Sequence, residues 1–331
     1  MRLPCRASKA QAAALAVVCI LALPLTAEAG EPEDGPSTGA RDDAYPPQNC
    51  YGDSTSRLIF GETLVGLSNP VGFENQLRLA GCWPLVARPG MFFAFTNIES
   101  GVFHYISPAY THQGAYLSLT PLSFLNFRLE AAGVHVWPVK ALPGAGHFSR
   151  AGYRDSFYTP DGIDNRIDPG MTDAGGSNIV FATTLQASLT LAHLAKGKLE
   201  MLLVNTLGVE YWSVGNDPYY YNIRKDVTLA RSDVILTDFG LVAIGVPLAK
   251  ALSLRMGAFD SLVYIPGGNL VGNNQVGAMV SIFMERVRKR VRGLQPFLQI
   301  AGYTNQAARR LGLGLNVVIG IDLSVMLWPW P

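Results

Sequence analysis

Strict alternation of apolar residues in the C-terminal segment constrains the fold more than any other feature of this sequence. From Leu311 to Leu327 every second residue is leucine, isoleucine or valine, whereas the residues between them include Gly312, Asn316 and Asp322. Successive side chains of a β-strand point to opposite faces, so the segment predicts one long strand with an apolar and a polar face. Strands of soluble proteins are usually only about five or six residues long. The length therefore favours a strand that crosses a membrane.

The same pattern recurs along the chain, at 125–130, 179–191, 199–210, 252–256 and 276–285. The polar face of these segments is lightly charged and rich in glycine, serine, threonine and glutamine. In a bilayer every backbone polar group needs a partner, which leaves helices and closed barrels as the structures that span it. We therefore predict an all-β fold, an antiparallel transmembrane β-barrel with lipid outside and polar residues toward the lumen.

The alternation predicts about twelve strands, an even number as expected for bacterial barrels. The predicted ranges are 57–67, 72–84, 91–106, 110–120, 122–137, 177–194, 198–214, 222–245, 249–264, 274–287, 293–303 and 310–328. With the amino terminus in the periplasm, the inner turns are short and the outer connections are longer, which is typical of such barrels. The longest outer loop is 138–176.

The amino-terminal part divides into two segments before the barrel domain, 57–331. Residues 1–29 have a basic start, an apolar run from Ala12 to Leu25 and an A-x-A pattern at Ala27–Ala29, which together predict a secretory signal peptide. Residues 30–56 are rich in Pro, Gly and Asp and predict a flexible periplasmic segment. Charged residues are 15% of the chain and the net charge is +1. This balance gives no argument for a nucleic-acid partner.

Aromatic residues gather at the predicted strand ends. Trp83, Phe92, Phe93, Trp328 and Trp330 fall at the periplasmic ends, and Trp137, Tyr211, Trp212, Tyr219, Tyr220, Tyr264 and Tyr303 at the outer ends. Two aromatic girdles are a feature of membrane barrels. Over residues 57–328 the chain resembles a Gram-negative outer-membrane β-barrel protein in architecture. The resemblance implies the bacterial outer membrane, contact with lipid and lipopolysaccharide, and insertion by the barrel-assembly machinery. It implies no cofactor.

One departure from that resemblance lies at the C-terminus. Such proteins usually end on an aromatic residue that the assembly machinery reads, whereas this chain ends on Pro331. Either the machinery tolerates the extra proline, or it reads Trp328 or Trp330 slightly inside the end.

Two cysteines follow the predicted signal peptide, Cys50 and Cys82, and an even pair in an exported protein predicts a disulfide. A bond between them would hold residues 30–56 across the inner mouth. That segment is then either a plug or a tail that the disulfide only fastens.

The loop 138–176 carries a run of aspartates that includes Asp161, Asp164 and Asp168. Dense carboxylate oxygens are ligands for Ca²⁺, but Asp-Gly and Asp-Pro pairs are also ordinary turn formers, and the order of an EF-hand loop is absent. The loop has a second interpretation, in which it folds into the outer mouth and narrows it.

Charged residues at lumen-facing positions are the candidate selectivity residues. They are Glu62, Glu74, Arg78, Arg128, Glu130, Glu200, Glu210, Arg255, Glu285 and Asp322. They are either structural ion pairs or a selectivity ring, and the excess of acids would favour cations or neutral solutes. Bulky residues on the same parity would make part of the bore apolar, namely Met279, Phe283, Phe297, Tyr303, Val318 and Met326.

Three functions fit these features. The preferred one is an outer-membrane channel or uptake pore for a small solute, with a hydrophobic solute as one option. The alternative is a closed structural or adhesive barrel whose outer loop makes the functional contacts. The third is a lipid-directed hydrolase, for which His135 and Ser177 fall on the lipid-facing parity of adjacent strands near the outer end. We assign no catalytic residue.

Overall fold

The computed structural model describes residues 56–68, 71–86, 92–93, 96–137, 146–148, 175–193, 199–214, 219–222, 224–225, 227–230, 232–249, 251–266, 270–285, 287, 291–306 and 315–329. Twelve long antiparallel strands form one closed barrel, as the alternation predicted. They are β1 (Arg57–Ser68), β2 (Val71–Val86), β3 (Thr96–Ile106), β4 (Tyr110–Leu122), β5 (Leu125–Val136), β7 (Gly176–His193), β8 (Leu199–Val214), β11 (Ser232–Ala249), β12 (Leu252–Ile265), β13 (Leu270–Glu285), β14 (Val291–Gln306) and β15 (Leu315–Pro329).

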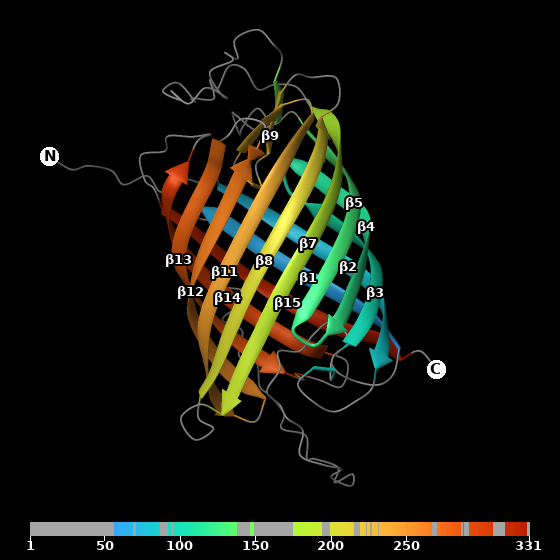
Figure 1. The fold of residues 1–331 in the computed structure, drawn as a ribbon, viewed down its shortest axis with the longest axis vertical. Coiled ribbons are helices and arrows are strands. Elements are labelled where there is room, and N and C mark those ends of the chain that lie inside the picture. The colour runs from blue at the N-terminus through green and yellow to red at the C-terminus, as the bar shows by residue number, and fades with distance from the viewer. Residues whose placement is uncertain are drawn as a thin grey trace, which may run out of the picture. The chain divides into compact units, whose positions relative to one another are not determined.

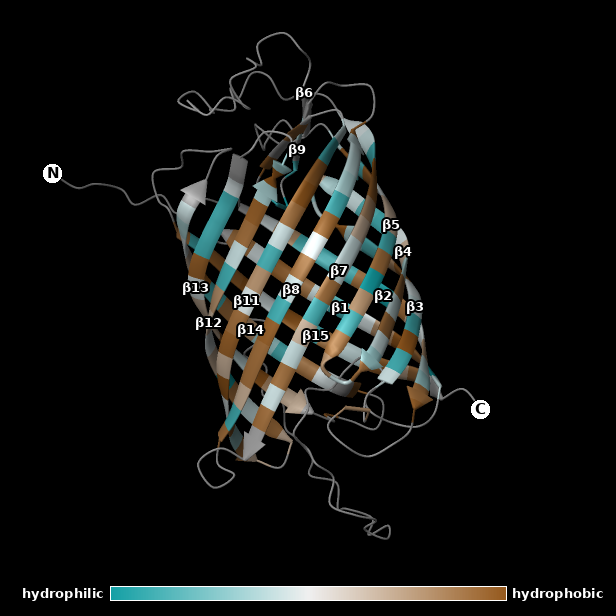
Figure 2. Cartoon of the chain, in the orientation of Figure 1, coloured by the Kyte–Doolittle hydropathy of each residue, from teal (hydrophilic) through white to brown (hydrophobic). Residues whose placement is uncertain are grey.

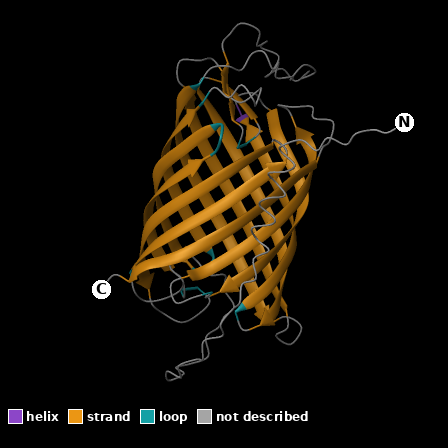
Figure 3. Ribbon diagram, turned by 180° about the vertical axis from the view of Figure 1, so that it is seen from behind, coloured by secondary structure: helices purple, strands orange, loops and turns teal. Residues whose placement is uncertain are grey.

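The barrel closes between the first and the last strand. β1 pairs with β15, and Thr63 stands directly opposite Asp322 in that register. Every other strand pairs with the barrel strand that precedes it and the one that follows it in the chain. Figures 1 and 3 show the tilted strands from opposite sides. Closure leaves no unpaired edge, which is the condition for a sheet to reside in a bilayer.

Side-chain exposure follows the alternation along each strand. On β4, Leu117 is 49% exposed and points outward, whereas its neighbours Tyr116 and Ser118 are buried toward the lumen. Exposed leucine, valine, isoleucine and phenylalanine recur around the outer wall, and Figure 2 shows apolar and polar residues alternating along the strands. A wall of this kind is suited to hydrocarbon rather than to water.

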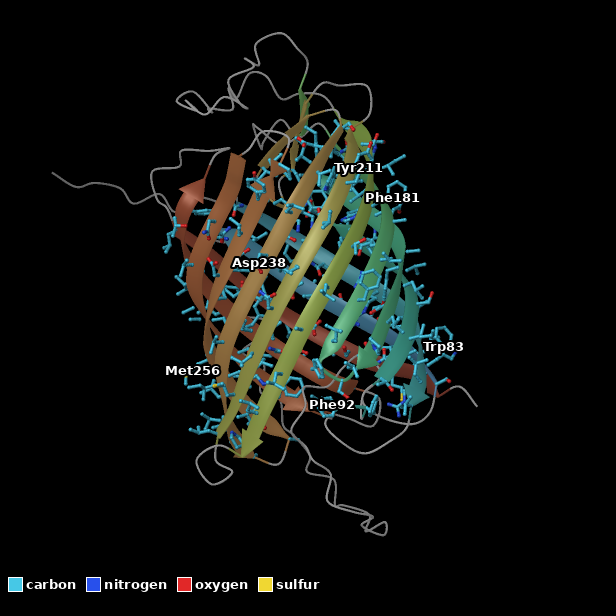
Figure 4. All side chains as sticks on the ribbon, viewed as in Figure 1. Trp83, Phe92, Phe181, Tyr211, Asp238 and Met256 are labelled. Atoms are coloured by element: carbon cyan, nitrogen blue, oxygen red, sulfur yellow. The ribbon has the colours of Figure 1, made fainter. Side chains whose placement is uncertain are left out.

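Exposed aromatic residues lie at both ends of the barrel, and among them Trp83, Phe92, Phe93 and Tyr211 were predicted girdle residues, whereas Phe181 was not. Trp83 and Phe92 lie near one end of the barrel and Phe181 and Tyr211 near the other (Figure 4). Trp212 and Tyr220 do not belong to the outer girdle, because both are buried inside the barrel at 3% and 2% exposure. Among the described residues, no helix is long and apolar enough to cross a membrane.

The predicted strand 222–245 is wrong in its first ten residues. β11 begins at Ser232, and the preceding residues form a short hairpin of β9 (Tyr219–Asn222) and β10 (Val227–Ala230). β9 also pairs with β6 (Gly146–Phe148), which gives a separate three-stranded sheet. The physical reason is local, because the Asn222 side-chain oxygen accepts hydrogen bonds from the backbone N–H groups of Arg224 and Lys225 and so turns the chain.

The predicted third strand, 91–106, starts later than expected. β3 begins at Thr96, whereas Phe92 and Phe93 lie in a turn. The Phe92 carbonyl accepts a hydrogen bond from the Ser123 N–H, and its ring makes an edge-on contact with Phe124. Tertiary packing against the β4–β5 turn therefore replaces the first part of the predicted strand.

Candidate solute pathway through the barrel lumen

The β9–β10 hairpin lies inside the barrel, against its inner wall. Tyr220, Val227 and Leu229 are almost fully buried, and they share one core with lumen-facing residues of the barrel strands. The Tyr220 ring stacks on Trp212 of β8, with ring centroids 5.7 Å apart. The hairpin connects the outer ends of β8 and β11 and occupies part of the lumen near that end.

Gly272 on β13 makes room for the hairpin. A Cβ atom at this position would lie 2.5 Å from a Val227 methyl group, closer than any real contact of that kind. The Asn273 side chain next to it donates a hydrogen bond of 2.6 Å to the Lys225 carbonyl. The wall is therefore shaped and hydrogen-bonded to receive the hairpin.

Two cations at the tip of the hairpin bind carboxylates on nearly opposite walls. Arg224 Nε lies 3.0 Å from a Glu74 oxygen on β2, and Lys225 Nζ lies 2.8 Å from a Glu210 oxygen on β8. β2 and β8 are five positions apart in the ring of twelve strands. The hairpin tip therefore bridges the lumen from one wall to the other.

Neighbouring polar and aromatic groups hold this bridge. Arg224 Nη1 lies 2.9 Å from His112 Nδ1, and its guanidinium lies 4.8 Å from the Tyr105 ring centroid. Tyr110 donates a hydrogen bond to Glu74. Burial alone would lower the pKa of Arg224, but Glu74, Tyr110 and other nearby groups together raise it above its usual value. Arg224 is therefore charged, and its charge is matched within the lumen.

On the Lys225 side, one more contact fixes the carboxylate. Trp212 Nε1 donates a hydrogen bond of 3.0 Å to the Glu210 oxygen that Lys225 does not bind. Both oxygens of Glu210 are therefore occupied, and the pair is held in one geometry. Because Trp212 already holds the Glu210 carboxylate, the pair loses less side-chain entropy on forming than a mobile surface ion pair does.

Below the hairpin, the wall of β1–β5 and β15 carries a second set of charges. Arg128 pairs with Glu130 at 2.8 Å and lies over the Tyr116 ring at 3.9 Å. Tyr116 donates a hydrogen bond to Glu99, which is 1% exposed. Arg78 interacts electrostatically with Glu99 and Asp322, and Thr63 donates a hydrogen bond of 2.7 Å to Asp322.

The strand register locates the predicted selectivity residues. Those on lumen-facing positions are Glu74, Arg78, Arg128, Glu130, Glu200, Glu210, Arg255 and Asp322. Glu285 pairs with Gly293 on the same parity, and its side chain lies outside the described set. The contacts bring them together as ion pairs and hydrogen-bonded groups rather than as one ring.

Glu62 requires a correction, because it faces outward. It stands opposite Leu323 of β15 and Leu77 of β2, whereas its neighbour Thr63 bonds lumen-facing Asp322. On the outer wall Glu62 accepts a long hydrogen bond, 3.4 Å, from the Asn75 amide. The predicted lumen-facing orientation of Glu62 was wrong because β1 lacks the regular apolar alternation that identifies the lipid-facing side of the other strands.

The cysteine and calcium predictions fall mainly outside the described residues. Cys82 is fully buried on the lumen side, against Ile59. Its predicted partner Cys50 and the segment 30–55 are not described, so the disulfide and the amino-terminal plug stay predictions. Asp161, Asp164 and Asp168 also lie outside the described residues, so the calcium site stays a prediction. Within the described part of the chain, no group of three or more His, Cys, Asp or Glu side chains is placed to hold a metal.

His135 and Ser177 do meet on the outer face. They stand opposite each other in the β5–β7 register, with His135 Nδ1 2.9 Å from Ser177 Oγ. A Ser–His nucleophile also needs a group that orients the histidine. The other close ring contact of His135 among the described residues is Trp137, at 6.3 Å between centroids. Among the residues that the structure describes, the geometry thus supplies a hydrogen-bonded pair at the membrane border without an acid that orients the histidine.

Sequence reasoning missed the residues that close the lumen, Arg224, Lys225 and His112. The alternation predicts that Arg224 and Lys225 lie in a membrane-crossing strand, 222–245, and no pattern in the sequence distinguishes His112. The available signal was the adjacent pair of cations after three tyrosines, because Arg-Lys in the middle of a spanning strand would put one cation on the lipid face.

Comparison with known proteins finds similar folds at low identity. The β domain of the Bordetella autotransporter BrkA is 9% identical, with 81% of this chain and 99% of that chain covered and a TM-score of 0.46. An outer membrane channel from Pseudomonas putida F1 is 12% identical, with 88% and 100% covered and a TM-score of 0.43. No family model and no curated relative matches the chain. The closed sheet and the exposed apolar outer wall of this chain show a transmembrane β-barrel fold, and no specific family is identified.

Proposed function

We propose that the protein is an outer-membrane channel for uptake of a small solute, and that the β9–β10 hairpin is its gate. The observation that carries this proposal is the ionic bridge at the hairpin tip, Arg224 to Glu74 and Lys225 to Glu210. Twelve strands enclose a wider space than an eight-stranded barrel, whose interior is filled by wall side chains. Here the β9–β10 hairpin occupies the outer part of that space. It is held against the wall by noncovalent contacts alone.

Ion pairs break and form reversibly, so the two pairs at the tip allow the hairpin to leave the lumen wall. Each pair is only partly buried, with Arg224 29% and Lys225 28% exposed. Exposed and partly exposed pairs contribute about 1 kcal/mol or less, and salt weakens them. Packing of Tyr220, Val227 and Leu229 favours the closed state, so the channel is expected to be mostly closed at rest.

The test is planar-bilayer conductance of the refolded protein and of the double variant Glu74→Gln, Glu210→Gln. Loss of both carboxylates leaves the tip cations unpaired, and we expect the open probability to rise about tenfold or more. Glu62→Gln is the matched control, because it makes the same chemical change on the outer wall, away from the hairpin.

The closed structural barrel is the second candidate, and the hairpin itself favours it. Its core with the lumen wall is the packing expected of a permanently filled interior. Silence of the wild type and of the double variant, from protein that migrates as a folded barrel, would support this function and end the channel proposal.

A further inference from the structure

The middle of the lumen has two chemically different halves. On β8, β11, β12, β13 and β14, lumen-facing apolar residues form one continuous cluster. Its members are Leu241, Ala243, Phe259 and Ala301, with Leu202, Val204, Phe239 and Met279 packed against them. The Phe239 and Phe259 rings lie 5.9 Å apart. Of the apolar bore residues that the sequence predicted, only Met279 belongs to this apolar wall.

The apolar wall faces the charged wall across the barrel. β11, which carries Phe239 and Leu241, lies six positions from β2 in the ring of twelve strands, and Arg78 is on β2. The neighbouring strands β3, β5 and β15 carry Glu99, Arg128 and Asp322. A molecule in this part of the lumen therefore has hydrocarbon on one side and polar groups on the other.

Several lumen-facing side chains at this level are not fully covered by other protein atoms. Leu202, Val204, Phe239 and Met279 point inward and are only partly buried, and the Arg128 side chain is 23% exposed. Apolar side chains that face a wet space carry a cost in free energy, which an apolar solute would relieve. The apolar wall is thus a contact surface for such a solute.

The charged wall offers hydrogen-bonding groups to a solute, but its acids and bases already interact with one another or with hydroxyl groups. Glu130 is paired with Arg128, Glu99 accepts from Tyr116 near Arg78, and Asp322 accepts from Thr63. The three acids exceed the two bases by one, so an anionic solute gains no net attraction. Arg128 Nε is buried without a hydrogen-bond partner, whereas the Arg128 side chain as a whole is 23% exposed, so part of the guanidinium borders the lumen.

We propose that the solute is small, uncharged and amphipathic, with an aromatic or branched aliphatic body and a hydroxyl-bearing polar part. The body lies on the apolar wall and the polar part on the Arg78–Arg128 side. This inference rests on the proposed channel function and names its substrate class.

Proteoliposome swelling with three lipid-impermeant solutes tests the inference. Phenyl glucoside is the amphipathic probe, maltose is a fully polar molecule of similar bulk, and phenyl glucuronide carries a carboxylate in place of the hydroxymethyl group of the probe. In the Glu74→Gln, Glu210→Gln variant, which releases the hairpin, we expect phenyl glucoside to enter faster than both. Equal entry of phenyl glucoside and maltose, or faster entry of the glucuronide, would overturn the proposed class.

A volume-conserving variant then tests the apolar wall itself. Leu202→Asn, Val204→Thr and Met279→Gln, in the same background, make the wall polar with little change in size. We expect the ratio of phenyl glucoside to maltose entry to fall roughly tenfold while single-channel conductance is kept. An unchanged ratio at full conductance would overturn the role of the wall but leave the channel standing. Absence of both swelling and conductance in the released variant would overturn the channel function as well.

Discussion

At the scale of single residues, two aspartates occupy an unusual place on the outer wall. Asp238 on β11 and Asp260 on β12 share the outward parity with exposed Val242 and Met256. Asp238 lies between the two aromatic ends of the barrel in Figure 4 and accepts a hydrogen bond of 2.8 Å from Asn205. Asp260 is four residues before Tyr264, which at about 3.3 Å per residue and a tilt of about 40° places it roughly 10 Å below the outer girdle.

We expect Asp260→Leu to raise the free energy of unfolding by about 1 kcal/mol, because an acidic side chain on the lipid-facing wall is unfavourable. Urea unfolding in lipid vesicles, followed by tryptophan fluorescence, measures the change. Asp238→Leu is the companion variant, and its gain should be smaller because the Asn205 amide loses its acceptor. A loss of stability in Asp260→Leu would contradict lipid as the neighbour of this face.

At the scale of elements, the hairpin depends on the wall that receives it. The β9–β10 strands are only four residues each and bury their apolar residues against β8, β11 and β13. Isolated two-stranded hairpins are marginal in water, so this one owes its structure to the barrel. A change in the wall should therefore displace the hairpin while the barrel remains.

Gly272→Leu is the variant that tests this dependence. Its side chain would occupy the space of Val227, so we expect the hairpin to leave the wall and the bilayer conductance to rise. Thiol labelling of Leu229→Cys, buried in the wild type, should become about tenfold faster. Gly240→Leu is the control, because nothing lies within 4 Å of its added Cβ atom on the outer wall. Slow labelling in both variants would show that the hairpin tolerates the added side chain.

At the scale of the whole molecule, the hairpin changes the charge balance of the lumen. The described lumen walls carry more acids than bases. The acids are Glu74, Glu99, Glu130, Glu200, Glu210, Asp233 and Asp322. The bases are Arg57, Arg78, Arg128 and Arg255. Arg224 and Lys225 of the hairpin offset most of this excess.

Replacement of residues 216–230 by a short Asn-Gly turn should therefore make an open pore that selects cations. β8 and β11 pair through their own register, so the barrel should still close. Reversal potentials in a salt gradient measure the selectivity, and we expect a clear shift toward the cation potential relative to the Glu74→Gln, Glu210→Gln variant. Anion selectivity of the shortened protein would contradict the charge balance described above.

Much of this architecture was predictable from particular segments. The alternation of β15 and β7 predicted long strands with one apolar and one polar face, and the pattern of short inner turns and longer outer connections agreed with a membrane barrel. The lumen parity of Glu74, Arg128 and Asp322 followed from counting along each strand. Such features depend on near neighbours in the chain, because strand periodicity fixes which face a residue occupies.

The sequence by itself thus determined a closed barrel with an apolar outside and a polar inside. Only the tertiary structure decided what occupies the lumen. Arg224 meets Glu74, and Lys225 meets Glu210, because the closed ring brings β2 and β8 to nearly opposite walls of one narrow space. Alternation distinguishes inside from outside, but it carries no information about contacts across the barrel. Those contacts depend on closure, on the space left at Gly272, and on the need of each buried charge for a partner.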